Sequence, residues 1–188
     1  MKKLMTIVLA IVLIAGFTST SNAQISIGAK AGIALPMGTF GDVYGLGFGG
    51  SAIGEYALNE NMAVGLNIGY YTFSGKDLPA GYSSTFSVIP IIVDYKYFFQ
   101  TEGFMPYVGA GLGMYLETAK TTTPSITVGS ITIPGMDVSA SESKFGFAPK
   151  VGFWMGDGFK YGASLEYNLL SDFNHLGINV GFIYPLGK

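Results

Sequence analysis

The sequence predicts an all-β protein, an eight-stranded antiparallel up-and-down transmembrane β-barrel. Three observations predict this fold: eight segments alternate in side-chain character with a period of two, the charges in those segments favour one of the two faces, and only 12% of the 188 residues are charged while 49% are hydrophobic. Strand side chains point alternately to the two faces of a sheet, and soluble domains usually contain about 25% charged residues. So few charges indicate a surface that meets lipid.

The first 23 residues have the pattern of a cleaved signal peptide. A pair of N-terminal lysines precedes an apolar run that ends in the small residues Ser21-Asn22-Ala23, which are suited to a signal peptidase. We expect cleavage before Gln24, so that residues 24–188 form one barrel domain. An N-terminal membrane anchor is the alternative, but anchors normally need about 20 apolar residues.

Eight segments after the signal peptide have the length of membrane-crossing strands. We expect strands at residues 24–35, 45–58, 62–73, 84–99, 106–118, 143–155, 160–170 and 175–186. A tilted strand needs about 9 to 11 residues to cross a bilayer. Short turns alternate with longer loops, of which residues 119–142 are the longest, and this asymmetry is typical of outer-membrane barrels.

Each of the first four strands has one apolar face. Ile27 marks this face in the first strand, Leu66 in the third and Ile91 in the fourth. The second strand is less regular, because Ile53 shares a face with Glu55. We expect a bulge or a frayed edge near Gly49-Gly50 to account for it.

The last four strands alternate in the same way. In residues 106–118 the apolar side chains from Val108 to Leu116 share one parity, while glycines, tyrosines and Glu117 occupy the other. The next three strands carry their apolar face on Phe145, Leu165 and Val180. A period of two over this length predicts a half-buried strand.

The distribution of charges predicts which face meets lipid. Counted over five positions per face in every strand but the second, the apolar face has no charge and the other face has twelve glycines. The charges on that other face are Lys30, Asp94, Lys96, Glu117, Lys150, Lys160 and Glu166. A lysine facing lipid at the midplane would cost roughly 2 to 4 kcal/mol, so we expect the charges to face the lumen. A soluble lipocalin-like barrel would reverse the faces, leaving mostly glycine and alanine in water.

Aromatic residues gather near both ends of the strands, and we expect them to form two interfacial girdles. The girdle at the short turns would contain Tyr95, Tyr97, Tyr107, Phe153, Tyr161 and Tyr184. The girdle at the long loops would contain Tyr70, Phe73, Phe86, Phe145 and Phe173.

Six inward charges are expected to form a cluster in the lumen. They are Lys30, Glu55, Asp94, Lys96, Lys150 and Glu166, and all but Lys96 are counted to similar depth from the short-turn end. An eight-stranded barrel is just wide enough for its interior side chains to fill it, and buried charges persist when they are paired. The sequence therefore predicts a filled, largely non-conducting lumen, with a gated proton or ion path as the alternative.

Three segments of the chain resemble the outer-membrane β-barrel domain family, the small barrels related to the OmpA, OmpX and OmpW types. They are Gly28-Ala29-Lys30-Ala31-Gly32, the run from Phe104 to Gly113, and the closing strand. In that strand Asn179, Gly181, Tyr184 and Leu186 resemble the signal that the barrel-assembly machinery reads. The resemblance implies location in the outer membrane of a Gram-negative cell and a structural or surface-interaction role. A narrow OmpW-like conduit for small hydrophobic molecules is the alternative.

The composition excludes several classes of function. The chain has no cysteine and no arginine, and its net charge is -2, which excludes disulfides, thiolate metal sites and a basic surface for nucleic acid. Ser171, Asp172 and the single histidine, His175, lie close in sequence, but catalysis would require hydrogen-bonded geometry that spacing does not provide. We therefore expect a monomer without catalytic site, cofactor or metal.

The longest loop offers a possible site for a surface partner. Within residues 119–142, Gly129-Ser130 suits a two-residue turn that would place Ile126 opposite Ile133 and Val128 opposite Ile131. We expect either a hairpin that captures a partner by strand addition or a weakly specified loop. Outer-membrane lipid and the assembly machinery are the other expected partners.

Overall fold

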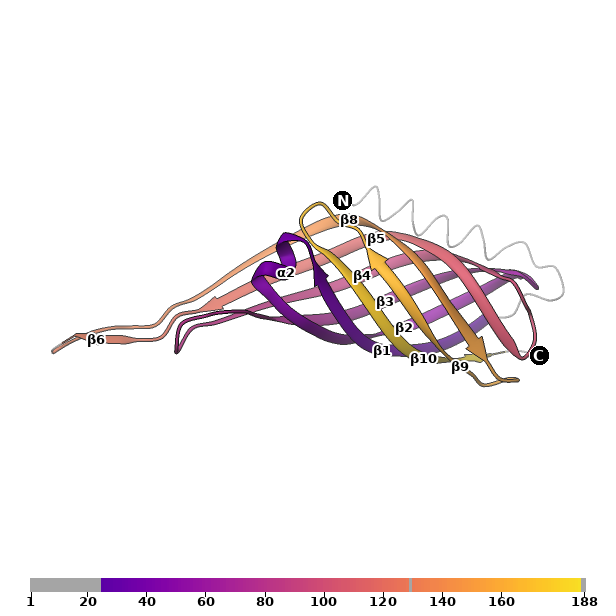
Figure 1. The fold of residues 1–188 in the computed structure, drawn as a ribbon, viewed down its shortest axis with the longest axis horizontal. Helices are drawn as coiled ribbons and strands as arrows, with labels where there is room; N and C mark the ends of the chain where they lie inside the picture. Colours follow the sequence, from indigo (N-terminus) through magenta and orange to yellow (C-terminus); the bar gives the residue numbers. More distant parts are fainter. Residues whose placement is uncertain (1–24, 129, 187–188) are drawn as a thin grey trace.

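The computed structural model describes residues 25–128 and 130–186, which form the closed antiparallel barrel drawn in Figure 1. Its strands are β1 (Ile25–Met37), β2 (Tyr44–Asn59), β3 (Met62–Gly75), β4 (Ser83–Phe98), β5 (Phe104–Thr122), β8 (Asp137–Met155), β9 (Lys160–Asn168) and β10 (Asn174–Pro185). Successive strands pair with one another and β1 pairs with β10, which closes the ring. The predicted eight-stranded up-and-down barrel is confirmed. The expected signal peptide lies outside the described residues.

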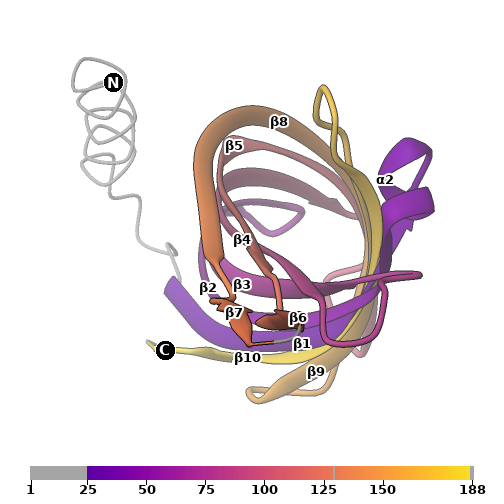
Figure 2. The same ribbon diagram turned by 90° about the vertical axis from the view of Figure 1, so that its left-hand side faces the viewer.

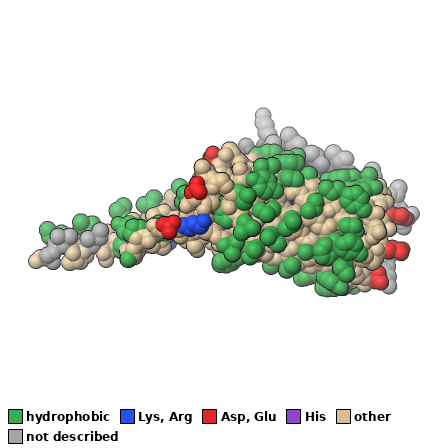
Figure 3. All heavy atoms as spheres, viewed as in Figure 1, with side chains coloured by type: hydrophobic (Ala, Val, Ile, Leu, Met, Phe, Trp, Pro, Cys, Tyr) green, Lys and Arg blue, Asp and Glu red, His purple; other side chains and the backbone are tan. Residues whose placement is uncertain are grey.

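The alternating pattern separates the two surfaces of the wall. Leu112, Val180 and Phe182 are 52%, 64% and 42% exposed on the outside, whereas Asp94 and Lys150 are buried inside. Figure 3 shows hydrophobic side chains over much of the face of the barrel that it views, with acidic side chains at the short-turn end. Among the residues that the structure describes, no helix is long and apolar enough to span a membrane.

The second strand does not contain the predicted bulge. β2 pairs with both neighbours without interruption through Gly49 and Gly50, and its irregularities lie at its two ends. Ile53 is 5% exposed and packs in the lumen beside Met105 and Trp154. The expectation was wrong because an inward position in a narrow lumen accepts an apolar side chain as readily as a charged one.

The predicted girdles need correction. Among the residues expected there, Tyr107, Phe73, Phe86 and Phe173 are buried inside the barrel. Tyr70, Tyr95, Tyr97, Phe145, Tyr161 and Tyr184 are exposed on the outside. Parity, and not distance from the strand ends, decides which surface Tyr107, Phe73 and Phe86 meet, whereas Phe173 lies between β9 and β10.

The segment 119–142 is more regular than a loop. β5 and β8 continue their pairing as far as Thr122 and Asp137, and β4 accompanies β5 to the same level through the pairing of Ser83 with Thr122. The hairpin of β6 (Ile126–Val128) and β7 (Ile131–Ile133) follows, with the expected pairing of Ile126 with Ile133 and of Val128 with Ile131. Figure 1 shows this projection extending away from the barrel, and Figure 2 views the barrel from that end. A short helix, α2 (Thr39–Val43), connects β1 to β2.

Candidate functional site

Six charged side chains lie together in the middle of the lumen. They are Lys30 on β1, Glu55 on β2, Asp94 and Lys96 on β4, Lys150 on β8 and Glu166 on β9. None is more than 8% exposed. Three lysines and three acids make the group electrically balanced, and we refer to it as the charge layer.

The charge layer is a chain of alternating signs. Lys30 pairs with Glu166, whose Oε1 lies 3.7 Å from Lys150 Nζ. Lys150 Nζ lies 3.3 Å from Asp94 Oδ2. Asp94 Oδ1 lies 3.7 Å from Lys96 Nζ, and Lys96 pairs with Glu55. Each inner member therefore has a neighbour of opposite sign on both sides, which is the arrangement that makes buried charge tolerable.

Strand register creates this arrangement. Lys96, Gly109 and Lys150 are directly opposite one another on β4, β5 and β8, and Glu166 follows on β9. A Cβ atom at Gly109 would lie 3.2 Å from Lys96 Cγ and 3.3 Å from Lys150 Cγ. Glycine thus leaves the space in which two long side chains cross the lumen.

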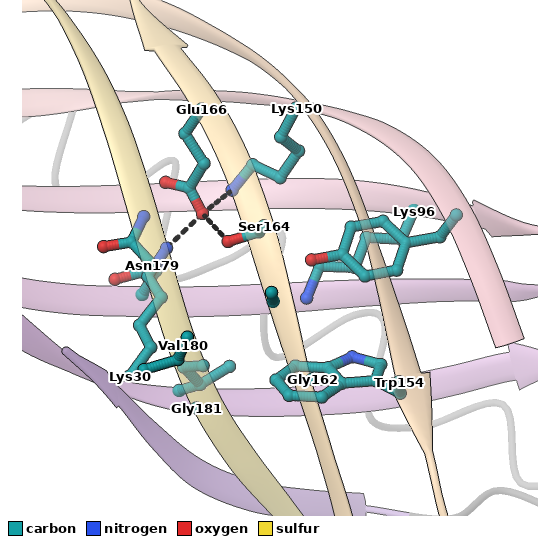
Figure 4. Close-up of a pocket in the computed structure, with 14 residues that line it drawn as sticks. Lys30, Lys96, Lys150, Trp154, Gly162, Ser164, Glu166, Asn179, Val180 and Gly181 are labelled. Atoms are coloured by element: carbon teal, nitrogen blue, oxygen red, sulfur yellow. Dashed lines mark hydrogen bonds and ion pairs between the residues drawn. The ribbon is translucent and has the colours of Figure 1, made fainter. Parts of the chain in front are cut away.

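An aromatic layer lies on the short-turn side of the charge layer. Lys96 Nζ lies 5.2 Å from the ring centroid of Tyr107 and 5.8 Å from that of Trp154, distances that permit cation–π attraction. Figure 4 shows Lys96 and Trp154 on one side of the lumen and the pair of Lys30 with Glu166 on the other. Trp154 is the only tryptophan of the chain.

Two tyrosine–asparagine pairs lie on the long-loop side of the charge layer. Tyr71 Oη donates to Asn179 Oδ1 at 2.9 Å, and Tyr115 Oη donates to Asn168 Oδ1 at 2.7 Å. All four residues are buried. Sequence reasoning did not single out these pairs, although Tyr115 shares its parity with Glu117 and Asn168 shares its parity with Glu166.

A second aromatic cluster closes the outer mouth of the lumen. It contains Phe40, Phe73, Phe86, Phe173 and Tyr44. His175 stacks on Phe173 with ring centroids 4.6 Å apart. The lumen is therefore layered, with aromatic rings above and below a charged centre.

The cavities in the layered part are small. Two cavities beside the charge layer measure about 10 Å³ each, close to the minimum of roughly 10 to 15 Å³ that holds one water molecule. A bowl of about 910 Å³ lies at the short-turn end, with Trp154, Met105 and Ile183 among its lining residues. The bowl is therefore far larger than either cavity beside the charge layer.

The residues considered for catalysis do not converge. Asp172 Oδ2 accepts a hydrogen bond from Lys144 Nζ at 2.9 Å, and this bond lowers the pKa of the exposed Asp172 carboxyl below its ordinary value. His175 is buried in the aromatic cluster, while Ser171 is exposed. Within the described ranges, no group of three or more histidine or acidic side chains is placed to hold a metal ion.

The four residues that resemble an assembly signal divide between the two surfaces. Asn179 is 2% exposed in the lumen, and a Cβ at Gly181 would lie 2.8 Å from Lys30 Cβ. Tyr184 and Leu186 are 53% and 57% exposed on the outside. This strand therefore presents its aromatic residue to lipid and its polar residue to the lumen.

Comparisons with known proteins agree with this architecture. The sequence matches the outer membrane protein beta-barrel domain family over residues 6–184, while no curated protein matches it. The attachment invasion locus protein Ail of Yersinia pestis, in complex with the heparin analogue sucrose octasulfate, is 19% identical with a TM-score of 0.58, covering 87% of this chain and 97% of its own.

Two further solved structures share the fold. Neisserial surface protein A is 19% identical with a TM-score of 0.58, covering 85% of this chain and 96% of its own. A major outer membrane protein from Thermus thermophilus is 14% identical with a TM-score of 0.62, covering 87% of this chain and 99% of its own. At these identities the likeness concerns the fold. The match over nearly the whole sequence, together with the closed barrel, shows that the chain belongs to the outer membrane protein beta-barrel domain family.

Proposed function

We propose that the protein is a non-conducting outer-membrane barrel whose projection makes contacts at the cell surface. The observation that carries the first part is the charge layer, because its six members leave cavities of only about 10 Å³ beside them. Passage of an ion would require these pairs to separate in the lumen. The lumen has a low dielectric constant, and an unpaired buried charge there is costly. A balanced, filled lumen supports a structural role for the charges.

A narrow conduit for small hydrophobic molecules is the second candidate. The bowl of about 910 Å³ at the short-turn end supports it, since this space could admit a small molecule. The bowl ends at the charge layer, however, and a hydrophobic molecule would have to displace ion pairs to continue. The conduit therefore ranks behind the closed barrel.

Conductance in planar bilayers tests both candidates. We expect the wild-type protein and Lys150→Ala to leave the conductance near zero, while the latter loses stability. Large, long-lived channels in the wild type would overturn the closed barrel. Uptake of a hydrophobic dye into protein-containing vesicles, without ionic current, would favour the conduit.

The projection supports the second part of the proposal. β8 pairs with β5 along its whole length but with β9 only from Lys150 to Met155 and at the bridge of Phe147 with Leu169. In the pairing that the structure describes, residues 137–145 of β8 therefore have one edge open. An open edge can accept a strand from another protein through main-chain hydrogen bonds.

A polysulfated partner, such as the one in the Ail complex, fits this end of the barrel poorly. The charged residues of the long loops and the projection are Asp42, Lys76, Asp77, Glu117, Lys120, Asp137, Glu142, Lys144 and Asp172. Acids outnumber lysines, and Lys120 and Lys144 already pair with acids. We infer that the surface partner is a polypeptide strand.

Two variants separate a role of the open edge from a role of the barrel. Replacing residues 119–140 with Asn-Gly joins Thr118 to Ser141, which are directly opposite one another, so we expect an intact barrel. Ser139→Pro removes one main-chain donor. The N–H of Phe147 points towards β9. Ser139 has the same parity on β8, so its N–H points to the open edge. Both variants should reduce adhesion of protein-bearing bacteria to cultured epithelial cells, and unchanged adhesion would refute partner capture.

We also infer export through the predicted signal peptide, insertion of the monomer into outer-membrane lipid, and recognition of the closing strand by the assembly machinery. The lipid-facing Tyr184 supports recognition, because an aromatic side chain on the outside remains accessible before the barrel closes. Tyr184→Ala should slow insertion in cells while leaving stability in detergent nearly unchanged. Equal rates of insertion would contradict this role.

A further inference from the structure

Phe40 fixes α2 to the outer mouth of the barrel. It is 7% exposed, whereas Thr39, Asp42 and Val43 on the same helix are exposed. Figure 2 shows α2 at the rim of the barrel, on the right of the view. Phe40 is thus the buried side chain of this helix.

The ring of Phe40 occupies a box of four aromatic side chains. Its centroid lies 4.4 Å from Phe173, 4.8 Å from Tyr44, 5.0 Å from Phe86 and 5.2 Å from Phe73. The contact with Tyr44 is stacked and the other three are edge-on, and both arrangements are favourable for aromatic pairs. We call these four residues the aromatic box. It is shaped to hold a benzenoid ring.

The remaining attachments of the helix are few and lie at the surface. Lys76 Nζ donates to the carbonyl oxygen of Gly41 at 2.7 Å, and the Lys76 N–H donates to that of Val43 at 2.8 Å. The chain enters the helix through Gly38, whose φ is 60°, a conformation that favours glycine. Release of Phe40 from the box would require the two bonds to Lys76 to break but would leave the pairing of β1 with β2, which lies at residues 25–34 and 47–56, intact.

The aromatic box is closed on its inner side. Phe73 and Phe173 contact His175, and below them Tyr71 is tied to Asn179. A ring that enters from outside would stop at this floor. The geometry is that of a binding site, not of an entrance to a channel.

We propose that the aromatic box is a binding site for a benzenoid ring presented from outside the cell, and that Phe40 is its resident competitor. Binding of the external ring releases α2 from the mouth of the barrel. The apparent affinity is the intrinsic affinity reduced by the fraction of molecules in which Phe40 has left the box. Removing the Phe40 ring therefore strengthens binding.

Release of the helix can be measured on the otherwise wild-type protein. Because the chain has no cysteine, Asp42→Cys provides a single position for a spin label on an exposed part of α2. N-acetyl-phenylalaninamide and benzyl alcohol should both make the label more mobile, whereas N-acetyl-alaninamide should not. A response to the first compound alone would assign the ring to a peptide side chain, and a response to the second alone to a free aromatic compound. An unchanged spectrum with both compounds up to their solubility would overturn the proposal.

Affinity provides the second measurement. Phe40→Ala should bind the compound that mobilises the label at least 10-fold more tightly than the wild type, and Phe40→Leu should lie between them. Phe104→Ala is the matched control, since Phe104 is 48% exposed on the outside of the barrel, and its affinity should equal that of the wild type. Gel mobility would check that each barrel is folded. If Phe40→Leu is folded and its affinity equals that of the wild type, the proposal is overturned, even if Phe40→Ala does not fold.

Discussion

Lys150 joins the two halves of the charge layer. Its ammonium lies between Asp94 and Glu166, and the residue is 3% exposed. Removing the Lys150 side chain would leave an excess of negative charge in the lumen, where the cavities measure only about 10 Å³. We therefore expect the loss of this one side chain to have a large effect on the free energy of unfolding.

We expect Lys150→Ala and Glu166→Ala each to lower the free energy of unfolding by about 3 to 5 kcal/mol, the usual effect of breaking a buried pair. Urea unfolding in lipid vesicles, followed by the fluorescence of Trp154, would measure the change. Lys120→Ala is the control, because Lys120 and Asp137 form an exposed pair and such pairs contribute about 0 to 1 kcal/mol. A similar loss in all three variants would contradict a special role for the lumen.

Tyr70 and Tyr71 allow a comparison of adjacent residues on opposite faces. Tyr71→Phe deprives the buried Asn179 oxygen of its donor, and we expect a loss of about 1 to 2 kcal/mol. Tyr70 is 53% exposed on the outside, so Tyr70→Phe should change the same free energy by less than about 0.5 kcal/mol. Equal losses would show that the hydrogen bond to Asn179 does not stabilise the barrel.

At the scale of elements, inward glycines set how closely strands and side chains approach. A Cβ at Gly146 on β8 would lie 2.6 Å from Tyr115 Cε2 and 3.1 Å from the carbonyl oxygen of Leu169. Tyr115 is itself fixed by its bond to Asn168. On β2, by contrast, a Cβ at Gly54 would meet no atom within 4 Å.

These two glycines should respond differently to the same substitution. Gly146→Ala should destabilise the barrel by about 1 to 3 kcal/mol through overpacking. Gly54→Ala should be neutral or stabilising by about 0.4 to 1 kcal/mol, since it restricts the unfolded chain. Thermal unfolding monitored by gel mobility would measure both. Destabilisation by Gly54→Ala alone would contradict this account.

At the scale of the whole molecule, the barrel reverses the usual distribution of polarity. Its apolar side chains cover the outside (Figure 3), and six buried charges face the lumen. Only a lipid environment makes this distribution stable, because the closed sheet satisfies its own backbone while its outer face offers water few polar groups.

A charge on this outer face should therefore be costly. Leu112→Lys, at the centre of β5, should reduce stability in vesicles by roughly 2 to 4 kcal/mol. Leu78→Lys is the control, since Leu78 is similarly exposed but lies between β3 and β4, beyond the strands, and we expect a change below about 0.5 kcal/mol. Equal tolerance of both lysines would contradict the assignment of the apolar face to lipid.

The number and order of strands could be predicted from the sequence because the pattern of a membrane-crossing strand is local. Each of the eight segments alternates on its own, and the outward positions of Leu112 and Val180 follow from parity alone. The pairing of Ile126 with Ile133 was predictable for the same reason, since a two-residue turn fixes register between neighbours.

The predicted girdles did not take into account the parity of each aromatic residue along its strand. Phe73 shares its parity with Asn67, and Tyr107 shares its parity with the glycines of β5. Applied to each aromatic residue, the same rule would have placed both in the lumen.

The sequence by itself determined the barrel, its two faces and the set of inward charges, because all three depend on a period of two along single strands. Only the tertiary structure decided which charges pair and that Phe40, on the short helix α2, enters the aromatic box. Those contacts join positions distant in the chain, such as Lys30 and Glu166, and their geometry depends on the stagger between strands once the barrel has closed.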